Sequence, residues 1–250
     1  MNYKNQLDLN HHIALVTGAS RGIGAITTKM LASFGAKVFI NYLEGENEAK
    51  IIADEIKRAG GKSSIVQADV SDIKQVQRMV KEIGDITLLV NNAGVIIRPA
   101  SWNEISDSDF DKTIAVNLKG QFNCIRTFAP QMLKNKFGRI VNISSTFGFI
   151  GAAPVVAYTA AKAGVINLTK SFAKEFAPYV NVNCICPGVI DTAMTRVAGE
   201  ELIKQSIQET PLKRLGKPEE IANVVCFLAS SLADFITGEV IVVDGGHSLR

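Results

Sequence analysis

The sequence predicts a doubly wound α/β fold built on a parallel sheet, in a single domain of 250 residues. Apolar runs typical of buried strands alternate with longer segments of helical periodicity along the whole chain. The strand-like runs end in small or polar residues, which favour turns. A hydrophobic content of 47% is enough for a substantial core. In such a sheet, ligands are expected at the carboxyl ends of the strands, where the strand order reverses.

Local signals justify the individual elements. Apolar runs bounded by turn residues predict strands at residues 13–16, 37–42, 63–68, 86–90, 138–144, 180–186 and 240–243. Helical spacing of apolar residues predicts helices at residues 23–34, 46–59, 107–134, 155–177 and 218–230. Another helix begins at Ser71 or Asp72, either of which can cap it. Gly60-Gly61 ends the second helix, and Ser106 caps the long one, whose first turns are acidic.

A glycine turn joins the first strand to the first helix. Gly18, Gly22 and Gly24 have the spacing Gly-x3-Gly-x-Gly, which differs from the Gly-x-Gly-x2-Gly of the usual dinucleotide fingerprint. Glycines let a backbone approach a pyrophosphate closely, and the N–H groups at the start of the next helix attract an anion. The turn therefore predicts a phosphate site, with backbone geometry alone as the alternative explanation.

The end of the second strand bears on which dinucleotide binds. An acidic residue about 20 residues after the glycines holds the ribose 2′-OH of NAD, whereas an arginine accommodates the 2′-phosphate of NADP. Here the strand ends in Asn41-Tyr42, the nearest acid, Glu44, lies beyond it, and Arg21 stands inside the glycine turn. We therefore expect NADP(H) in preference to NAD(H). The alternatives are that Glu44 folds back onto the ribose and that Arg21 is an ordinary loop charge.

Small or polar residues stand at the ends of three further strands. Asp69 follows the third strand, Asn91-Asn92-Ala93-Gly94 ends the fourth, and Ser144-Ser145 ends the fifth. Asp69 can bond an adenine edge or serve as a turn carboxylate. Asn117 lies in the middle of the long helix beside Gly120, although asparagine is a poor helix former. The three strand ends are expected at the edge that carries the glycine turn.

Tyr158 and Lys162 lie four residues apart in the helix at 155–177, so both side chains share one helical face. An ammonium group close to a phenol favours the phenolate, and the expected result is a tyrosine pKa lowered toward neutrality. Such a tyrosine is a usable general acid. The spacing alone is weak evidence, because many helices carry it by chance.

Composition narrows the function classes. Lys and Arg exceed Asp and Glu by 27 − 24 = 3, without a block of like charge, so no nucleic-acid partner is expected. No apolar run reaches the roughly 18 residues of a membrane span, and residues 1–12 are unlike a signal peptide, so a cytoplasmic protein is expected. The four cysteines lie on segments expected to be buried and predict free thiols, with neither a disulfide nor a metal site: Cys124, Cys184, Cys186 and Cys226.

Together the motifs resemble those of the short-chain dehydrogenase/reductase family. In the family's order the chain carries Thr17-Gly18-x3-Gly22-x-Gly24, Asn91-Asn92-Ala93-Gly94, Asn117, Ser145, Tyr158-x3-Lys162 and Pro187-Gly188. The match runs from about residue 9 to residue 246. The resemblance implies a Rossmann-type seven-stranded parallel sheet with helices on both faces. It also implies an NAD(P)-dependent oxidoreductase that acts on a CH–OH or C=O group.

The resemblance assigns a catalytic tetrad to Asn117, Ser145, Tyr158 and Lys162. Ser145 would hold the substrate oxygen, and Tyr158 would give it a proton as hydride arrives from the nicotinamide. Lys162 would bond the nicotinamide ribose and depress the tyrosine pKa. A water held by Asn117 would continue the proton path. Stabilising charge where it develops on oxygen is usually the largest catalytic effect.

The resemblance also implies the cofactor contacts. The phosphates would lie on the glycine turn with Ser20, Arg21 and Ile23, and Tyr158 and Lys162 would face the nicotinamide end. The adenosine part would be contacted by Asn41, Asp69, Val70, Asn91, Ala93 and Gly94. Closure over the nicotinamide is expected from Pro187, Gly188, Ile190 and Thr192.

Residues 9–186 are expected to form the dinucleotide-binding core, 187–215 a flap over the substrate, and 216–250 a last helix and strand. The resemblance also implies a homotetramer, with the helices at 107–134 and 155–177 between subunits and the C-terminal strand at another interface. Within the family the pattern is most similar to 3-oxoacyl carrier-protein reductases, which implies an acyl-carrier-bound carbonyl substrate. Lys136 and Arg139, expected near the cleft, would meet the acidic carrier.

One departure keeps another substrate class open. Where those reductases usually carry a second basic residue after the catalytic helix, this chain has Pro178-Tyr179. A glucose-type sugar or polyol dehydrogenase with a small-molecule substrate is therefore the alternative. A non-catalytic dinucleotide-binding regulator is a further one. A serine hydrolase is disfavoured, because Ser145 lacks a Gly-x-Ser-x-Gly turn.

Overall fold

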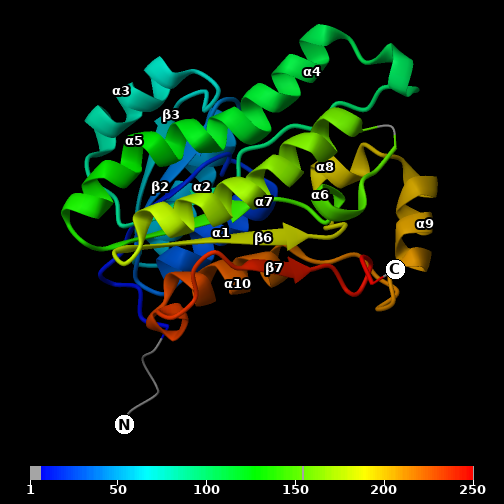
Figure 1. Ribbon diagram of the computed structural model, residues 1–250. Helices are drawn as coiled ribbons and strands as arrows, with labels where there is room; N and C mark the ends of the chain where they lie inside the picture. Colours follow the sequence, from blue (N-terminus) through cyan, green and yellow to red (C-terminus); the bar gives the residue numbers. More distant parts are fainter. Residues whose placement is uncertain (1–6, 154, 250) are drawn as a thin grey trace.

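The computed structural model describes residues 7–153 and 155–249 and is built on one seven-stranded parallel sheet (Figure 1). The strands follow the order β3-β2-β1-β4-β5-β6-β7. Their bounds are β1 (Ile13–Val16), β2 (Lys37–Tyr42), β3 (Lys62–Gln67), β4 (Leu88–Asn91), β5 (Gly138–Ile143), β6 (Val180–Pro187) and β7 (Val240–Val243). All six neighbouring pairs are parallel, so the predicted fold class is confirmed.

Helices cover both faces of this sheet (Figure 1). One face packs against α1 (Gly22–Ser33), α2 (Glu46–Arg58) and α10 (Pro218–Ala229). The other face packs against α3 (Ile73–Ile83), α5 (Gly120–Lys134) and α7 (Val156–Phe176), and α4 (Asp107–Ile114) leans on α7. The short helices α6 (Phe147–Ile150), α8 (Ala193–Arg196) and α9 (Glu200–Glu209) lie in connections at the carboxyl edge of the sheet.

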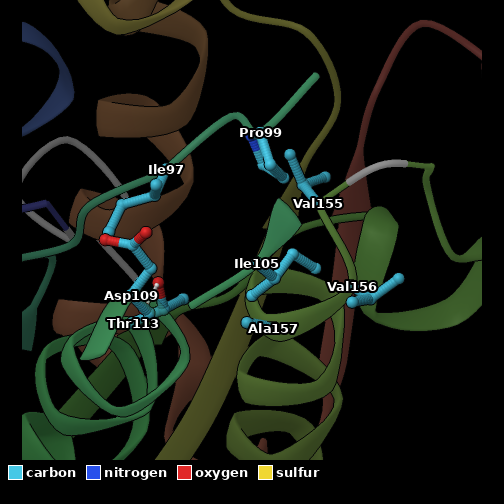
Figure 2. Close-up of a pocket in the computed structure, with 8 residues that line it drawn as sticks. All are labelled: Ile97, Pro99, Ile105, Asp109, Thr113, Val155, Val156 and Ala157. Atoms are coloured by element: carbon cyan, nitrogen blue, oxygen red, sulfur yellow. Dashed lines mark hydrogen bonds between the residues drawn. The ribbon is translucent and has the colours of Figure 1, made fainter. Parts of the chain in front are cut away.

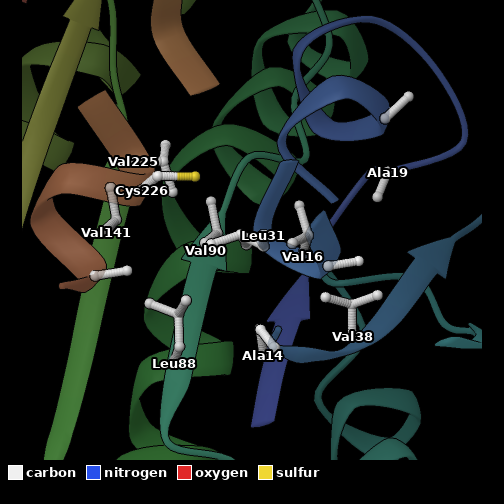
Figure 3. Close-up of a cluster of buried hydrophobic side chains, with 14 of the residues drawn as sticks. Ala14, Val16, Ala19, Leu31, Val38, Leu88, Val90, Val141, Val225 and Cys226 are labelled. Carbon is white, nitrogen blue, oxygen red and sulfur yellow. The ribbon is translucent and has the colours of Figure 1, made fainter. Parts of the chain in front are cut away.

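Successive side chains along each strand point to opposite faces of the sheet and so divide the core into two layers. Figure 3 shows Val16, Leu88 and Val90 on the face that meets Leu31 of α1 and Val225 of α10. The intervening residues of the same strands, such as Leu15 and Leu89, belong to the cluster under α3 and α5. The strands therefore bury side chains on both faces, as expected of a parallel sheet between helices.

The order β3-β2-β1-β4 places the reversal of winding between β1 and β4. β1 leads into the glycine turn, and β4 leads into Asn91-Asn92-Ala93-Gly94. Both connections leave from the carboxyl edge, where ligands of such sheets bind. The crevice predicted from the sequence is therefore framed by these two connections.

The long helix expected at 107–134 has an interruption. Residues Ala115–Lys119 form a π-helical turn, η3, between α4 and α5. A π turn inserts an extra residue per turn, and such turns are frequent at functional sites. Elsewhere the predicted bounds hold to within one or two residues, and Asp72 and Ser106 act as helix caps. Residues 1–6, 154 and 250 of the expected domain lie outside the described residues.

Candidate active site

The glycine turn after β1 has no room for side chains. Gly18 has a φ of +61°, and an added Cβ would lie 2.7 Å from the Cα of Ala93. A Cβ on Gly24 would lie 2.6 Å from the Nδ2 of Asn92. Gly22 also has a positive φ, of +57°. The turn is therefore pressed against the connection that follows β4, and its glycines are required by close approach as well as by backbone conformation.

Thr17 and Asn92 join these two connections, although the sequence did not single them out as site residues. The Thr17 hydroxyl accepts hydrogen bonds from the backbone N–H groups of Asn92 and Ala93, both at 3.0 Å. The Asn92 amide donates to the carbonyls of Thr17 and Gly18 at 2.9 and 3.0 Å. Their positions inside the glycine-turn motif and the Asn91-Asn92-Ala93-Gly94 motif were the sequence signal that could have identified them. They hold the crevice in shape.

The start of α1 suits an anion. Arg21 occupies the N-cap position in extended backbone, and its side chain makes no capping hydrogen bond. The first N–H groups of a 12-residue helix therefore lack a side-chain acceptor. Arg21 is exposed, whereas Ser20 is buried and donates to the carbonyl of Glu44 at 3.2 Å. This turn has the backbone donors and the positive charge that a phosphorylated ligand requires.

Asn41, which is expected at the adenosine ribose, lies near the end of β2. Its side chain is buried and bonds backbone groups: Oδ1 accepts from the N–H of Gly18 at 3.3 Å, and Nδ2 donates to the carbonyl of Ala68 at 3.1 Å. The amide thus ties β2 and the end of β3 to the glycine turn. A contact between Asn41 and the ribose would have to come from its backbone.

The residues expected around the adenosine part lie at the ends of β3 and β4. The Asp69 carboxylate accepts from the backbone N–H and hydroxyl of Ser71 at 2.8 and 2.7 Å. Val70 is buried, and its carbonyl accepts from the Asn123 amide at 2.9 Å. Asn91 is also buried, and its amide donates to the side chain of Asn142 at 2.9 Å. These side chains support the edge of the crevice, while Asp69 remains half-buried beside it.

The connection after β6 returns to the glycine turn. A Cβ added to Gly22 would have Thr192 as its neighbour at 3.6 Å. Thr192 caps α8, Ile190 pairs with Gly216 in an isolated bridge, and the carbonyl of Pro187 accepts from the N–H of Thr146 at 3.0 Å. The structure therefore brings the expected closing segment against the predicted phosphate turn.

Asn117 lies in η3, and both N–H donors of its side-chain amide are engaged. Nδ2 donates to the carbonyls of Val95 and Thr113 at 2.8 and 2.9 Å, and Oδ1 accepts from the N–H of Val95 at 3.2 Å. A Cβ on Gly94 would lie 2.7 Å from this Oδ1. The side chain thus clamps the connection after β4. The water that Asn117 is expected to hold stays a prediction.

Tyr158, Ser145 and Lys162 meet at the carboxyl end of β5. Ser145 is buried, follows the last residue of β5 by two positions, and hydrogen bonds with Tyr158. The Lys162 Nζ lies 5.5 Å from the centre of the Tyr158 ring and donates to the carbonyl of Ile143 at 2.9 Å. A Cβ on Gly94 would lie 3.7 Å from the Lys162 Nζ, so the pair stands beside the crevice.

The pKa values of this pair differ from the sequence expectation. Burial raises the pKa of Tyr158 to about 12, and the hydrogen bond with Ser145 and the charge of Arg98 act in the opposite direction. Burial lowers the pKa of Lys162 to about 8. The predicted depression of the Tyr158 pKa by Lys162 is therefore wrong for this structure. The reason is desolvation, which disfavours the charged form of both groups.

A small hollow lies between the segment that follows β4, helix α4 and the start of α7 (Figure 2). Its lining is mostly apolar and consists of Ile97, Pro99, Ile105, Asp109, Thr113, Val155, Val156 and Ala157. Its volume of about 10 Å³ is that of about one water molecule. Ala157 directly precedes Tyr158 in the chain, so the hollow and the tyrosine share the first turn of α7.

Lys136 and Arg139 do not lie near this cleft within the chain. Both stand at the beginning of β5, whereas Ser145 follows its end. Lys136 lies over the ring of Tyr179, 5.5 Å from its centre. Arg139 is buried and forms an ion pair with Asp234. The expected carrier contact at the cleft is thus wrong, because residues that precede a strand lie at the opposite edge from those that follow it.

The cysteines are buried free thiols, as predicted. Cys184 and Cys186 lie on β6 with their sulfurs 3.9 Å apart, on the side that faces Lys162. Over residues 7–153 and 155–249, no group of three or more His, Cys, Asp or Glu side chains is placed to hold a metal ion. No helix in the described ranges has the length and apolar character needed to cross a membrane.

Comparison with known proteins identifies relatives over most of the chain. A family model described as Enoyl-(Acyl carrier protein) reductase matches residues 18–248. The 3-oxoacyl-[acyl-carrier-protein] reductase FabG of Staphylococcus aureus is 44% identical over 238 residues, covering 93% of this chain and 96% of the relative. The corresponding reductase of Aquifex aeolicus is 43% identical over 247 residues, covering 96% and 99%.

Solved structures share the fold. A gluconate 5-dehydrogenase from Burkholderia cenocepacia, in complex with NADP and tartrate, has a TM-score of 0.92 at 31% identity over 98% of each chain. A 3-oxoacyl-[acyl-carrier protein] reductase from Brucella melitensis has a TM-score of 0.89 at 32% identity, covering 98% of this chain and 96% of that one. With the matched family model and these relatives, the chain is an oxidoreductase that belongs to the short-chain dehydrogenase/reductase family.

Proposed function

We propose that the protein is an NADPH-dependent reductase of 3-oxoacyl thioesters carried on an acyl carrier protein. The observation that carries the proposal is the meeting of Ser145, Tyr158 and Lys162 beside the glycine turn. Identity of 44% to a 3-oxoacyl-[acyl-carrier-protein] reductase supports the substrate class.

The glycine turn fits a dinucleotide. Gly18 and Gly24 let the turn pack closely against the connection after β4, and the start of α1 lacks a side-chain acceptor. The phosphates would be held by the N–H groups around Ile23, with Ser20 and Arg21 alongside. When bound, the reduced nicotinamide supplies the hydride.

The chain's own residues would hold the substrate oxygen and provide its proton. Ser145 bonds the carbonyl oxygen and fixes it next to Tyr158. Tyr158 donates the proton, and a pKa well above neutrality keeps its hydroxyl protonated before reaction. Lys162 would hold the nicotinamide ribose, and its own pKa of about 8 lets it gain or lose a proton near neutral pH. Asn117 fixes the connection that carries Gly94.

A sugar-acid dehydrogenase is the second candidate, and Arg98 favours it. Its guanidinium is exposed in the segment after β4, close enough to Tyr158 to affect that residue's pKa. Among the described residues, none forms an ion pair with Arg98. A free cation beside the reacting groups suits a substrate carboxylate. The similar gluconate 5-dehydrogenase supports the same class.

Steady-state kinetics separate the two substrate classes. Acetoacetyl thioester reduction with NADPH and gluconate oxidation with NADP+ are measured on the same preparation, each also with the NAD form. The main proposal requires the thioester to give the larger kcat/KM. Arg98→Gln should raise the KM for gluconate by about tenfold if a carboxylate binds there. Lys62→Gln, at the opposite edge of the sheet, is the matched control.

The cofactor preference has its own test. Arg21→Ala should raise the KM for NADPH by about tenfold or more, since a bond between two charged groups is lost, and should leave the KM for NADH nearly unchanged. Equal effects on both cofactors would reject the preference for NADPH.

We further propose a homotetramer located in the cytoplasm, in which residues 187–215 close over the substrate. Exposed apolar side chains on three of the elements involved support contacts between copies: Phe110 on α4, Phe122 on α5 and Val242 on β7. Light scattering on purified protein would reveal the assembly, and a monomer at micromolar concentration would contradict it. Cell fractionation tests the location.

A further inference from the structure

Two buried side chains donate to one carbonyl group at the end of β5. The oxygen of Ile143 accepts from the Nζ of Lys162 at 2.9 Å and from the Nε2 of Gln121 at 3.1 Å. Lys162 is 3% exposed and Gln121 is 2% exposed. A carbonyl oxygen has two lone pairs, so both bonds can exist together. Lys162 therefore shares this acceptor with a neutral amide.

Gln121 lies one helical turn after Asn117, at the start of α5. Its Oε1 is buried without a hydrogen-bond partner among the described residues. Burying an unpaired amide oxygen destabilises a fold, and an apolar side chain of the same size would avoid the cost. A purely structural explanation therefore accounts poorly for glutamine at this position.

We propose that Gln121 is a positioning residue for Lys162. The proposal rests on the role that the proposed function gives to Lys162, whose ammonium group bonds the Ile143 carbonyl through one of its three N–H groups and would hold the ribose through another. By sharing that carbonyl, Gln121 weakens its hold on the ammonium group. When Lys162 turns away, the amide keeps the carbonyl paired, so no buried acceptor is left without a donor.

The groups around Lys162 make the shared hydrogen bond important for its protonation. Burial already lowers the pKa of Lys162 to about 8, so few interactions decide whether it is charged near neutral pH. The titratable groups that face it are Tyr158 on its own helix and the thiols of Cys184 and Cys186 on β6, while Arg98 acts on Tyr158. Gln121 is the neutral group that approaches the same carbonyl from the α5 side.

Two variants test the proposal. Gln121→Met keeps the size and removes the donor, so Lys162 has the Ile143 carbonyl to itself and its pKa should rise by about half a unit. Gln121→Glu places a carboxylate there, and the rise should be about one unit or more. Gln131→Met, two to three turns further along α5 with a side chain bonded to Asn135, is the matched control and should change nothing.

The readout is an NMR titration of the lysine side chains in the ligand-free protein, with the Lys162 signal assigned by its loss in Lys162→Met. NADPH affinity, followed by fluorescence, should fall about fivefold in Gln121→Met at pH 7, because the Ile143 carbonyl then draws the Lys162 ammonium group more strongly away from the ribose. Its melting temperature should be unchanged or higher, because the unpaired oxygen is gone.

An unchanged Lys162 pKa in the folded variants, together with unchanged NADPH affinity, would overturn the proposal. A lowered melting temperature with no other effect would mean a structural role only. If Gln121→Met does not fold, the titration of Gln121→Glu decides. Because the titration needs neither cofactor nor substrate, its result is independent of whether thioester reduction is observed.

Discussion

Both edges of the sheet bury titratable side chains, but the pKa shifts leave those side chains in different protonation states near neutral pH. At the amino edge, burial lowers the pKa of His12 to about 4, so the imidazole stays neutral at physiological pH. At the carboxyl edge, burial lowers the pKa of Lys162 to about 8, into the range where proton exchange is useful. Burial alone therefore does not mark a catalytic group. What matters is where the shift leaves the group relative to the working pH.

The edges also differ in how they are closed. His12 bonds Thr87 at 3.1 Å and stacks on Phe137, and Arg139 pairs with Asp234 beside it. At the carboxyl edge, Gly18 and Gly24 let two connections pack closely, and the start of α1 has no side-chain cap. We infer that the amino edge serves stability and the carboxyl edge serves binding and chemistry. Pairs of variants, with one substitution at each edge, can test that distinction.

A tyrosine at each edge gives the largest expected contrast. Tyr158→Phe should lower kcat by about 10³-fold, because the proton donor is lost, while NADPH affinity changes little. Tyr179→Phe, at the start of β6, should leave kcat unchanged. The measurements are thioester reduction and NADPH fluorescence titration. Retention of most activity in Tyr158→Phe would contradict the proposed mechanism.

Glycines in the left-handed conformation, one at each edge, give the next largest expected contrast. Gly18→Ala should lower the free energy of unfolding by about 4 kcal/mol, because a clash with Ala93 adds to backbone strain. Gly60 has a φ of +85° with open space around it, so Gly60→Ala should cost only the strain, about 1 kcal/mol. Urea unfolding measures both values. Equal losses would show that the close approach of the two crevice connections is unimportant.

The amino edge predicts a pH dependence of stability. The pKa of His12 is about 4 in the folded protein against 6.5 for the ordinary side chain, so the unfolded chain binds more protons between these values. Stability should therefore fall as pH drops from 6.5 toward 4, by up to about 3 kcal/mol. His12→Gln should remove most of this slope. His11→Gln, at an exposed neighbour, should not, and similar slopes in all three proteins would exclude His12 as the cause.

The ion pair of the amino edge should give the smallest effect. Asp234→Asn removes the partner of the buried Arg139, but the Asp234 side chain is 68% exposed, so the expected loss is only about 1 kcal/mol. The rate of thioester reduction should be unchanged. A large fall in kcat would show that the two edges are coupled through β5.

The sequence was sufficient for the sheet, because each strand is a short apolar run followed by turn residues. It could not reveal η3, since a π turn preserves the apolar spacing of a helix over the residues on either side. The Tyr158 pKa was misjudged because a pairing at helical spacing says nothing about desolvation by other elements.

Two further differences between the sequence predictions and the structure have simpler causes. Lys136 and Arg139 were placed at the wrong edge although their position before β5 was sufficient to place them correctly. Gln121 was overlooked, and its signal was a second polar residue four positions after Asn117 on a helix face that is otherwise apolar. Local patterns located the reacting groups, whereas their protonation and support depend on contacts from distant segments.

The π turn η3 adds a residue between α4 and α5 without taking the two helices out of line. Because its hydrogen bonds run from i to i+5 instead of i to i+4, deleting one residue from 115–119 would restore a regular helix and leave both helices nearly in their present orientation. The change would be local, since Asn117 could no longer hold the carbonyls of Val95 and Thr113 in the same way. The connection after β4 could thus be loosened while the packing of α5 on the sheet persists.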